Sequence, residues 1–365
     1  MPTRWTELSA VALAPLLSLA LLLVACGPAA GEPAQPPSPT TSSTTAVDAG
    51  STPVDLTSLP LLDDALFPSG PCGGFESRSL VRAAAPLLSG RLTIRAVEGL
   101  ASNARPYNVM SAPEADESET RLYLEVGQSQ LVVFVEELFS RPGAHAVADI
   151  AAEDRYAKDA TIGRLAIEGL PTIAVVPKEM VPDHEKAVAL RLYVVTPDDL
   201  LVRFTFAVTP DVLGASAGCT RLARSMADTL AFGGRKVDLA GGERKLEGGV
   251  TMTLPADVAM VAQPGPDFVV YHAYVVSTLD AADGAFHVYF GDYPEQPRGQ
   301  KKIEGKLLGE SVTWLEDTSE SGTRGRQALV QVPGDRGLFM HVFYGAKSPA
   351  VLAAFDGMAA SLTKR

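Results

Sequence analysis

The chain has 365 residues, of which 46% are hydrophobic and 20% are charged, and its formal net charge is -12. This composition is typical of a globular protein. The negative charge excludes the basic surface that nucleic-acid binding requires, so we expect no nucleic-acid partner.

Residues 1–25 are typical of a signal peptide. Arg4 precedes an apolar run from Leu8 to Ala25 that is interrupted only by small residues and Pro15. An uncleaved membrane span needs roughly 17 to 25 apolar residues, so length alone does not separate the two interpretations.

The end of the apolar run favours cleavage. Leu23-Val24-Ala25-Cys26 resembles the lipobox of bacterial lipoproteins, in which a peptidase cuts before a cysteine that already carries a diacylglyceryl group. The resemblance implies that residues 1–25 are removed and that Cys26 carries diacylglyceryl and palmitate-type chains. Each buried methylene adds about 0.8 kcal/mol, so several chains anchor the protein stably to the cell envelope.

The residue after the cysteine bears on which membrane is used. Gly27 stands where the lipoproteins retained in the inner membrane of enteric bacteria carry Asp. By resemblance, we expect an outer-membrane location.

Residues 26–58 are interpreted as the lipidated cysteine and a disordered linker. The stretch consists mainly of Pro, Ser, Thr, Ala and Gly, and it cannot bury enough apolar surface to offset its ordering entropy. A coil of about 30 residues spans on the order of 30 Å, and a polyproline-like one about 90 Å. A plain spacer is preferred over a Pro-rich ligand for another protein.

The remaining residues are too many for one ordinary domain and are divided into a first domain, 59–234, and a second, 235–365. The two halves resemble each other. A Pro/Asp turn leads into residues 201–206 in the first half and into residues 338–343 in the second, which predicts a β-hairpin in each. A helix is expected after each hairpin, at 220–230 and 349–362.

The predicted fold class is α+β, with two tandem antiparallel-sheet domains and packed helices. A further helix is expected over residues 144–158. This order of elements resembles the PsbP-like fold. The resemblance implies binding or scaffolding rather than catalysis, and it transfers no site residues.

Three cysteines are present. With lipid on Cys26, the remaining Cys72 and Cys219 are expected to form a disulfide in an oxidising compartment. Two free thiols or a metal-binding pair remain the alternatives, whereas the Cys-x-x-Cys spacing of a redox motif is missing.

Residues 214–218 match the G-x-S-x-G pattern of a nucleophilic serine, which would be Ser216. The preceding predicted strand ends near Val208, so Ser216 does not follow it directly. A flexible helix entry is the preferred interpretation.

The second domain offers metal-ligand candidates in His272, His287 and His341, all on predicted strands. Alternation places His287 on one face with Tyr289, and His341 on one face with Phe339 and Phe343. If the strands are neighbours, the three rings could converge on a metal such as zinc. Separate sheet histidines are the preferred interpretation.

Two charged stretches are interpreted as solvated loops rather than ligand sites. They are the acidic residues 114–119 and the pair Lys301-Lys302.

The sequence therefore predicts a non-enzymatic envelope lipoprotein, without a cofactor, that binds or scaffolds an unknown envelope protein. The alternative is an envelope hydrolase or metal-dependent enzyme that uses the three histidines.

Overall fold

The computed structural model describes residues 56–364, apart from 83–86, 103–115, 118, 143–146, 149–150, 153, 155, 184–185, 210–217, 277–283 and 336. These residues belong to one compact unit, Ser51–Arg365. The predicted signal peptide, Cys26, nearly all of the linker and Ser216 lie outside the described residues.

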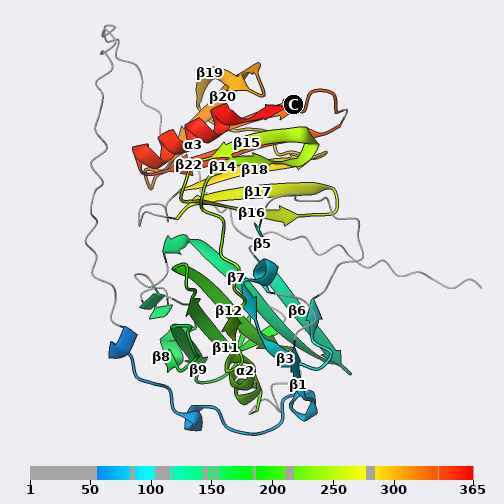
Figure 1. The fold of residues 1–365 in the computed structure, drawn as a ribbon, viewed down its shortest axis with the longest axis vertical. Coiled ribbons are helices and arrows are strands. Elements are labelled where there is room, and N and C mark those ends of the chain that lie inside the picture. Colours follow the sequence, from blue (N-terminus) through cyan, green and yellow to red (C-terminus); the bar gives the residue numbers. More distant parts are fainter. Residues whose placement is uncertain are drawn as a thin grey trace, which may run out of the picture. The chain divides into compact units, whose positions relative to one another are not determined.

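The first sheet is antiparallel and has the order β4-β6-β7-β12-β11-β9-β8, with β10 paired to β11 (Figure 1). Its strands are β4 (Ala101–Ser102), β6 (Glu119–Val126), β7 (Ser129–Pro142), β8 (Ala160–Leu165), β9 (Thr172–Pro177), β10 (Val181–Asp183), β11 (Lys186–Val195) and β12 (Leu200–Val208).

The second sheet has the order β19-β20-β21-β22-β18-β17-β16, and β5 (Asp116–Glu117) runs parallel to β16 at its end. Its strands are β16 (Val258–Pro264), β17 (Phe268–Val275), β18 (Ala285–Gly291), β19 (Lys301–Leu307), β20 (Glu310–Thr318), β21 (Arg324–Gln331) and β22 (Phe339–Ala346).

The two sheets have the same topology. If the antiparallel strands of each path are numbered along the chain, both sheets read 1-2-3-7-6-5-4 from the β4 or β16 edge. The accessory strands also correspond. β2 (Leu92–Thr93) pairs with β13 (Ala231–Phe232) after the first terminal helix, and β15 (Val250–Leu254) pairs with β23 (Thr363–Lys364) after the second. The sequence likeness of the halves therefore accompanies a repeated fold.

The two hairpins correspond with a different offset from the one the sequence suggested. The Thr196 N–H donates to the Leu200 carbonyl, and the Val332 N–H donates to the Leu338 carbonyl, both at 2.9 Å. Leu200, rather than Leu201, is therefore the counterpart of Leu338. The second turn is two residues longer, and this length difference hid the correct alignment.

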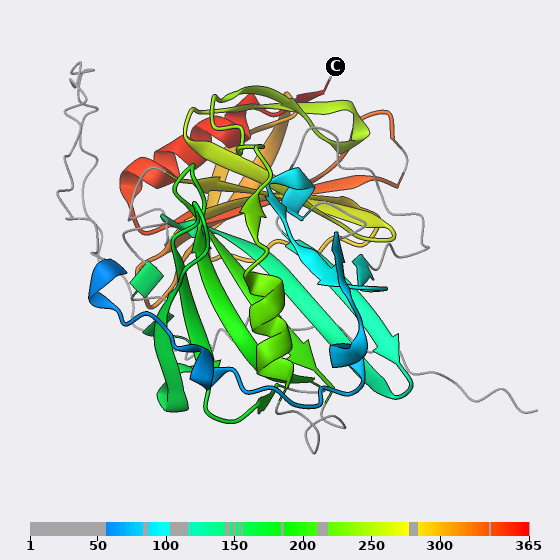
Figure 2. The ribbon, with the colours of Figure 1, turned by 60° about the horizontal axis from the view of Figure 1, so that its bottom comes forward.

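One helix follows each hairpin. The 9-residue α2 (Cys219–Ala227) lies against β11 of the first sheet (Figure 2), and the 13-residue α3 (Pro349–Ser361) lies against β22 and β15 of the second. Ser348 precedes α3, and Pro349 occupies the first turn, where its missing N–H costs no hydrogen bond. Leu352 and Phe355 on α3 are buried, as expected for a helix packed on a sheet.

The expected α+β class with PsbP-like packed helices is wrong. Strands dominate the fold, and in the part of the chain that the structure describes the α-helices with defined bounds are α2 and α3. Within the expected helix at 144–158, residues 147–148 and 151–152 are helical and Ala157–Asp159 form a 3-10 turn, and part of the range lies outside the described residues. Long β-branched and aromatic runs explain this outcome, because such residues pack well on a pleated surface.

The remaining elements are short. They are the strands β1 (Leu80–Arg82), β3 (Arg95–Val97) and β14 (Gly242–Lys245), and the 3-10 turns η1 (Leu56–Ser58), η2 (Asp64–Leu66), η3 (Phe75–Ser77), η4 (Leu88–Gly90), η5 (Ala157–Asp159) and η7 (Glu247–Gly249).

The folded part begins before the expected linker boundary at residue 58. Leu56 and Leu59 pack against a buried cluster on the first sheet. The chain then runs along β8, where the Leu62 N–H donates to the Arg164 carbonyl at 3.0 Å. No helix among the described residues is long and apolar enough to cross a membrane.

Candidate functional site

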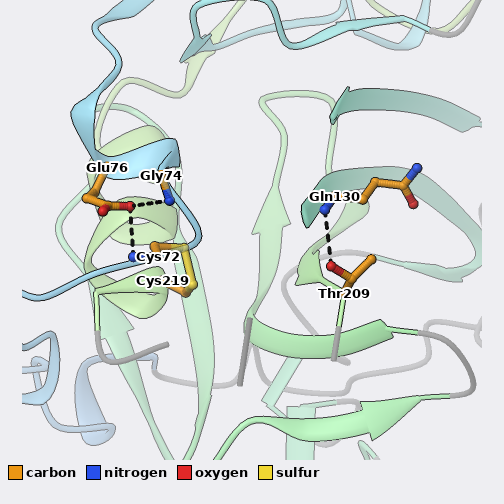
Figure 3. The surroundings of a disulfide bond; sticks show 6 residues. All are labelled: Cys72, Gly74, Glu76, Gln130, Thr209 and Cys219. Atoms are coloured by element: carbon orange, nitrogen blue, oxygen red, sulfur yellow. Dashed lines mark hydrogen bonds between the residues drawn. A yellow bond between two sulfur atoms is a disulfide. The ribbon is translucent and has the colours of Figure 1, made fainter. Parts of the chain in front are cut away.

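The structure forms a disulfide between Cys72 and Cys219, whose Cα atoms lie 4.8 Å apart although 147 positions separate them in sequence (Figure 3). A Glu76 carboxylate oxygen accepts the N–H of Cys72 at 2.8 Å and fixes the turn before the bridge. A Cβ added to Gly218 would lie 1.8 Å from the Gly70 carbonyl, so only glycine permits this close approach. The disulfide ties the entry segment to the start of α2.

The second sheet places two of the three candidate histidines in contact. His272 on β17 and His287 on β18 are register partners, and their Nδ1 atoms lie 2.7 Å apart. The rings meet edge to face, at 84° and with centroids 4.8 Å apart. His272 also stacks on Tyr274, and His287 stacks on Phe343 with centroids 4.7 Å apart.

His341 does not join this pair. Its register partner is Tyr289, and its Nε2 lies 3.2 Å from the Gln327 side-chain oxygen. The ring of Phe343 contacts both His341 and His287. The alternative in which all three rings converge on one metal is therefore not realised, and the preferred interpretation of separate histidines holds for His341 but not for His272 and His287. The residues described here contain no cluster of three or more His, Cys, Asp or Glu suited to a metal.

The paired histidines are neutral near pH 7. Burial lowers the pKa of His272 to about 4. Burial, followed by the neighbouring His272 ring, lowers the pKa of His287 to about 3. A neutral imidazole has one N–H and one free lone pair, so one Nδ1 donates a hydrogen bond to the other.

The histidine pair belongs to a larger surface that we call the histidine face. It is the side of the second sheet away from α3, and alternation along the strands assigns it Phe268, His272, Tyr274, His287, Tyr289, His341 and Phe343. Phe268 stacks on Tyr289 with centroids 5.9 Å apart. Its members are mostly half-buried, whereas their sequence neighbours on the opposite side form the core under α3. The face combines neutral nitrogen donors with aromatic surface.

The matching face of the first sheet has different chemistry. Counting from the aligned hairpins, Arg203 corresponds to His341 and pairs with Glu136 at 3.1 Å. By the same register, Arg121 corresponds to His272 and Phe134 to His287. The Arg121 guanidinium lies 4.9 Å from the centroid of the Phe134 ring. An ion pair and a cation–π pair in the first copy thus occupy the places of the His341–Tyr289 and His272–His287 pairs in the second.

Both charged stretches interpreted as loops include strand residues. Asp116 and Glu117 form β5, and Glu119 in β6 forms an ion pair with Arg121. Lys301 and Lys302 begin β19, where the Lys301 ammonium donates to Glu316 at 3.1 Å.

A charge cluster that no sequence motif predicts is centred on Glu316 in β20. Its carboxylate, 7% exposed, accepts hydrogen bonds from Lys301, Arg324 and Arg326. Burial acts to raise the pKa of Glu316, but the bonds from Arg326, Lys301 and Arg324 lower it to about 2. Arg326 also pairs with Asp356, which attaches α3 to the sheet. No sequence pattern reports the strand register that gathers these cations.

A second missed cluster lies in the first domain. The Arg91 side chain is 1% exposed and pairs with Glu137 and Asp198, the latter at 2.9 Å. Asp198 also accepts the Val237 N–H at 3.1 Å. These bonds join strand β7, the β11–β12 turn and the segment that leads out of the first domain.

No family model matches the chain, and no curated protein matches it. Three solved structures are weakly similar. The crystal structure of MucB in complex with MucA(peri) has 15% identity, covers 70% of this chain and 91% of the other, and has a TM-score of 0.17. The apo structure of the immunity protein TplEi of T6SS from Pseudomonas aeruginosa has 10% identity, coverages of 80% and 99%, and a TM-score of 0.20. The Pseudomonas aeruginosa MucA/MucB complex has 14% identity, coverages of 70% and 91%, and a TM-score of 0.16. TM-scores this low establish neither a shared fold nor a shared function.

Proposed function

We propose that the protein is a lipid-anchored lipoprotein of the cell envelope that binds or scaffolds another envelope protein. The observation that supports this most strongly is the division of the three cysteines. The fold joins Cys72 to Cys219, and disulfides persist in oxidising compartments outside the cytoplasm. The one cysteine left is Cys26, which ends the lipobox-like Leu23-Val24-Ala25-Cys26.

The length of chain between the anchor and the fold suits a partner away from the bilayer. About 30 residues rich in Pro, Ser and Thr separate Cys26 from Leu56, where the described fold begins. Such a segment reaches from about 30 Å as a coil to about 90 Å when extended. The two sheets can therefore contact a protein that does not lie flush with the membrane. The proposed location is the outer membrane, because Gly27 stands where lipoproteins retained in the inner membrane of enteric bacteria carry Asp.

Binding is favoured over catalysis because the buried charged side chains form ion pairs within the fold. Arg91, Glu137 and Glu316 are buried and engaged in ion pairs that connect strands, so their chemistry supports the fold. The histidine face instead displays aromatic rings, which are enriched in protein interfaces. The second copy of the sheet topology then provides an aromatic face for contact with a partner.

The anchor is tested by labelling with a radioactive fatty acid in a bacterial host that processes lipoproteins. The wild-type chain should incorporate label and lose residues 1–25. Cys26→Ser should remain unlabelled and keep its signal peptide, while Cys72→Ser, the matched control, should still be labelled. Label on the Cys26→Ser chain would refute the anchor.

The binding role is tested by crosslinking and pull-down from native membranes. The wild-type protein should recover the same envelope protein reproducibly, and Cys26→Ser should recover much less of it, because a chain held by its uncleaved signal peptide does not reach the proposed outer-membrane location. Equal recovery of that protein by an unrelated lipidated domain would refute a specific partner.

A further inference from the structure

We propose that His272 and His287 together bind one divalent transition-metal ion, with their Nδ1 atoms as neighbouring ligands and with a preference for Cu²⁺ over Zn²⁺. The proposal concerns the histidine face alone and does not depend on the lipid anchor or on a protein partner.

The backbone preorganises the pair. His272 and His287 are direct register partners on adjacent antiparallel strands, so sheet hydrogen bonding fixes the spacing of their Cα atoms. Stacking on Tyr274 and Phe343 then fixes the planes of the two rings. When surrounding residues already hold the ligands in place, little conformational entropy is lost on metal binding.

The donor atoms are available for a cation. In the empty pair, one Nδ1 proton is shared across the 2.7 Å contact. A metal ion would take the place of this proton, which moves to the other nitrogen of the same ring. Imidazole nitrogens suit zinc, copper and nickel.

The distance between the nitrogens favours one geometry. With metal–nitrogen bonds of about 2.0–2.1 Å, a tetrahedral centre needs its ligands about 3.3 Å apart, and a right-angled centre needs them about 2.9 Å apart. The observed separation of 2.7 Å is closer to the right-angled arrangement. Square-planar and tetragonal centres are typical of Cu²⁺ and Ni²⁺, and Cu²⁺ binds most tightly in the divalent series.

His272 and His287 would be the two protein ligands, and the remaining coordination positions would be left to solvent or a small molecule. His341 is turned to Gln327, and the structure shows no third His, Cys, Asp or Glu ligand among the residues it describes. Water or a small external ligand would fill the other positions. The site is therefore expected to bind with moderate affinity and to exchange its ligands readily.

The first copy of the fold supplies matched replacements. Arg121 and Phe134 occupy the positions of His272 and His287 in an equivalent sheet and pack against each other. His272→Arg and His287→Phe therefore introduce side chains that this topology already accepts, while both remove a metal ligand. His272→Gln keeps a polar group at that position as a second choice.

The test is a Cu²⁺ titration of the purified full-length protein in detergent, followed by electron paramagnetic resonance. The wild type should bind one ion per chain, with hyperfine splitting from two nitrogen ligands. Each single substitution at His272 or His287 should weaken binding by roughly tenfold or more, because it removes one of two protein ligands. His145→Ala, His184→Ala and His341→Ala should leave the stoichiometry and the two-nitrogen spectrum unchanged.

Circular dichroism of each variant ensures that loss of binding is read only from folded protein, and His272→Gln replaces any variant that does not fold. A competition with Zn²⁺ completes the test, and Cu²⁺ should win. The proposal is overturned if the wild type shows no stoichiometric site at micromolar protein, if fewer than two nitrogens are seen, if binding survives loss of both histidines, or if Zn²⁺ binds more tightly.

Discussion

The two sheets share one strand order but differ in how their faces are used. In the first sheet, one face carries the core under α2 and the other carries a second buried cluster that includes Ile173, Val175 and Tyr193. In the second, one face forms the core under α3, and the histidine face is mostly half-buried. The same topology thus supports a sheet with buried clusters on both sides and a sheet whose second side is mostly half-buried.

The burial patterns of individual strands show this difference. Eight of the nine residues of β12, LLVRFTFAV, are buried, as in a strand covered on both faces. In β17, FVVYHAYV, buried and half-buried residues alternate along the strand through Ala273, so one face of this strand is less covered than the other. The two sheets therefore share the pairing of their strands but differ in their outward residues.

The largest expected effect comes from the buried ion pair that only the first copy has. Glu137 corresponds by register to Phe290 in the second sheet. Glu137→Ala leaves the Arg91 charge buried without this partner, so it should destabilise the first domain by about 3–5 kcal/mol. Urea unfolding followed by circular dichroism measures this loss.

The neighbouring residue supplies the control for that experiment. Glu136 pairs with Arg203 at a site where the two side chains are 40% and 29% exposed. Glu136→Ala should cost only about 0–1 kcal/mol, because solvent screens the pair. Equal losses for the two variants would mean that the buried cluster is not what distinguishes the first copy.

The disulfide should give the next largest effect, and it should be confined to the first copy. Replacing both Cys72 and Cys219 by Ser should cost about 2–5 kcal/mol. Trp314 is the one tryptophan after the predicted signal peptide and lies in β20, so its fluorescence reports the second sheet. The fluorescence transition should stay in place while the circular dichroism transition of the first domain moves. A matching shift of the Trp314 signal would show that the copies unfold as one unit.

The charge cluster of the second copy makes a prediction about acid. A carboxyl whose folded pKa is depressed stabilises the fold above its unfolded pKa, and this stabilisation is lost as the pH falls through the folded value. For Glu316 the contribution should be complete above about pH 4.5, at most about 3 kcal/mol, and should disappear on acidification toward pH 2.

Glu316→Gln should therefore flatten the acid dependence of the Trp314 unfolding transition. Glu310→Gln, at an exposed position on the same strand, is the control and should leave the dependence as in the wild type. An unchanged acid profile in Glu316→Gln would assign the acid sensitivity to other carboxyl groups.

Features that depend on local sequence pattern could be predicted from the sequence, whereas features that depend on strand register could not. The hairpins at Leu200 and Leu338, the two terminal helices and the Cys72–Cys219 bridge follow from turn residues, capping residues and cysteine arithmetic. The β-rich class was missed because the order of elements was matched to a family that has more helices.

The candidate site was only half predictable. Alternation correctly placed His287 on the same side of its strand as Tyr289, and His341 on the same side as Phe343, since side chains alternate along a strand. Whether two rings touch depends on which strands are neighbours and in what register, and this information is long-range. The contact of His272 with His287, and the separate bond of His341 to Gln327, could be read only from the folded chain.

The smallest expected effect concerns sheet edges, where the copies also differ. The β8 edge of the first sheet is covered by the segment that carries Leu62, whereas the corresponding β19 edge is protected by exposed charges such as Lys302, Glu304 and Lys306.

Deleting residues 28–54 should leave the melting temperature of the folded part unchanged, because a segment of this composition has too few apolar side chains to pack against the core. Extending the deletion to residue 62 should lower it, since it removes Leu56 and Leu59 from their buried cluster and opens the β8 edge. Differential scanning calorimetry of both deletions measures the contrast. A drop already present in the 28–54 deletion would show that the linker packs on the fold, and no drop in the longer deletion would show that β8 needs no cover.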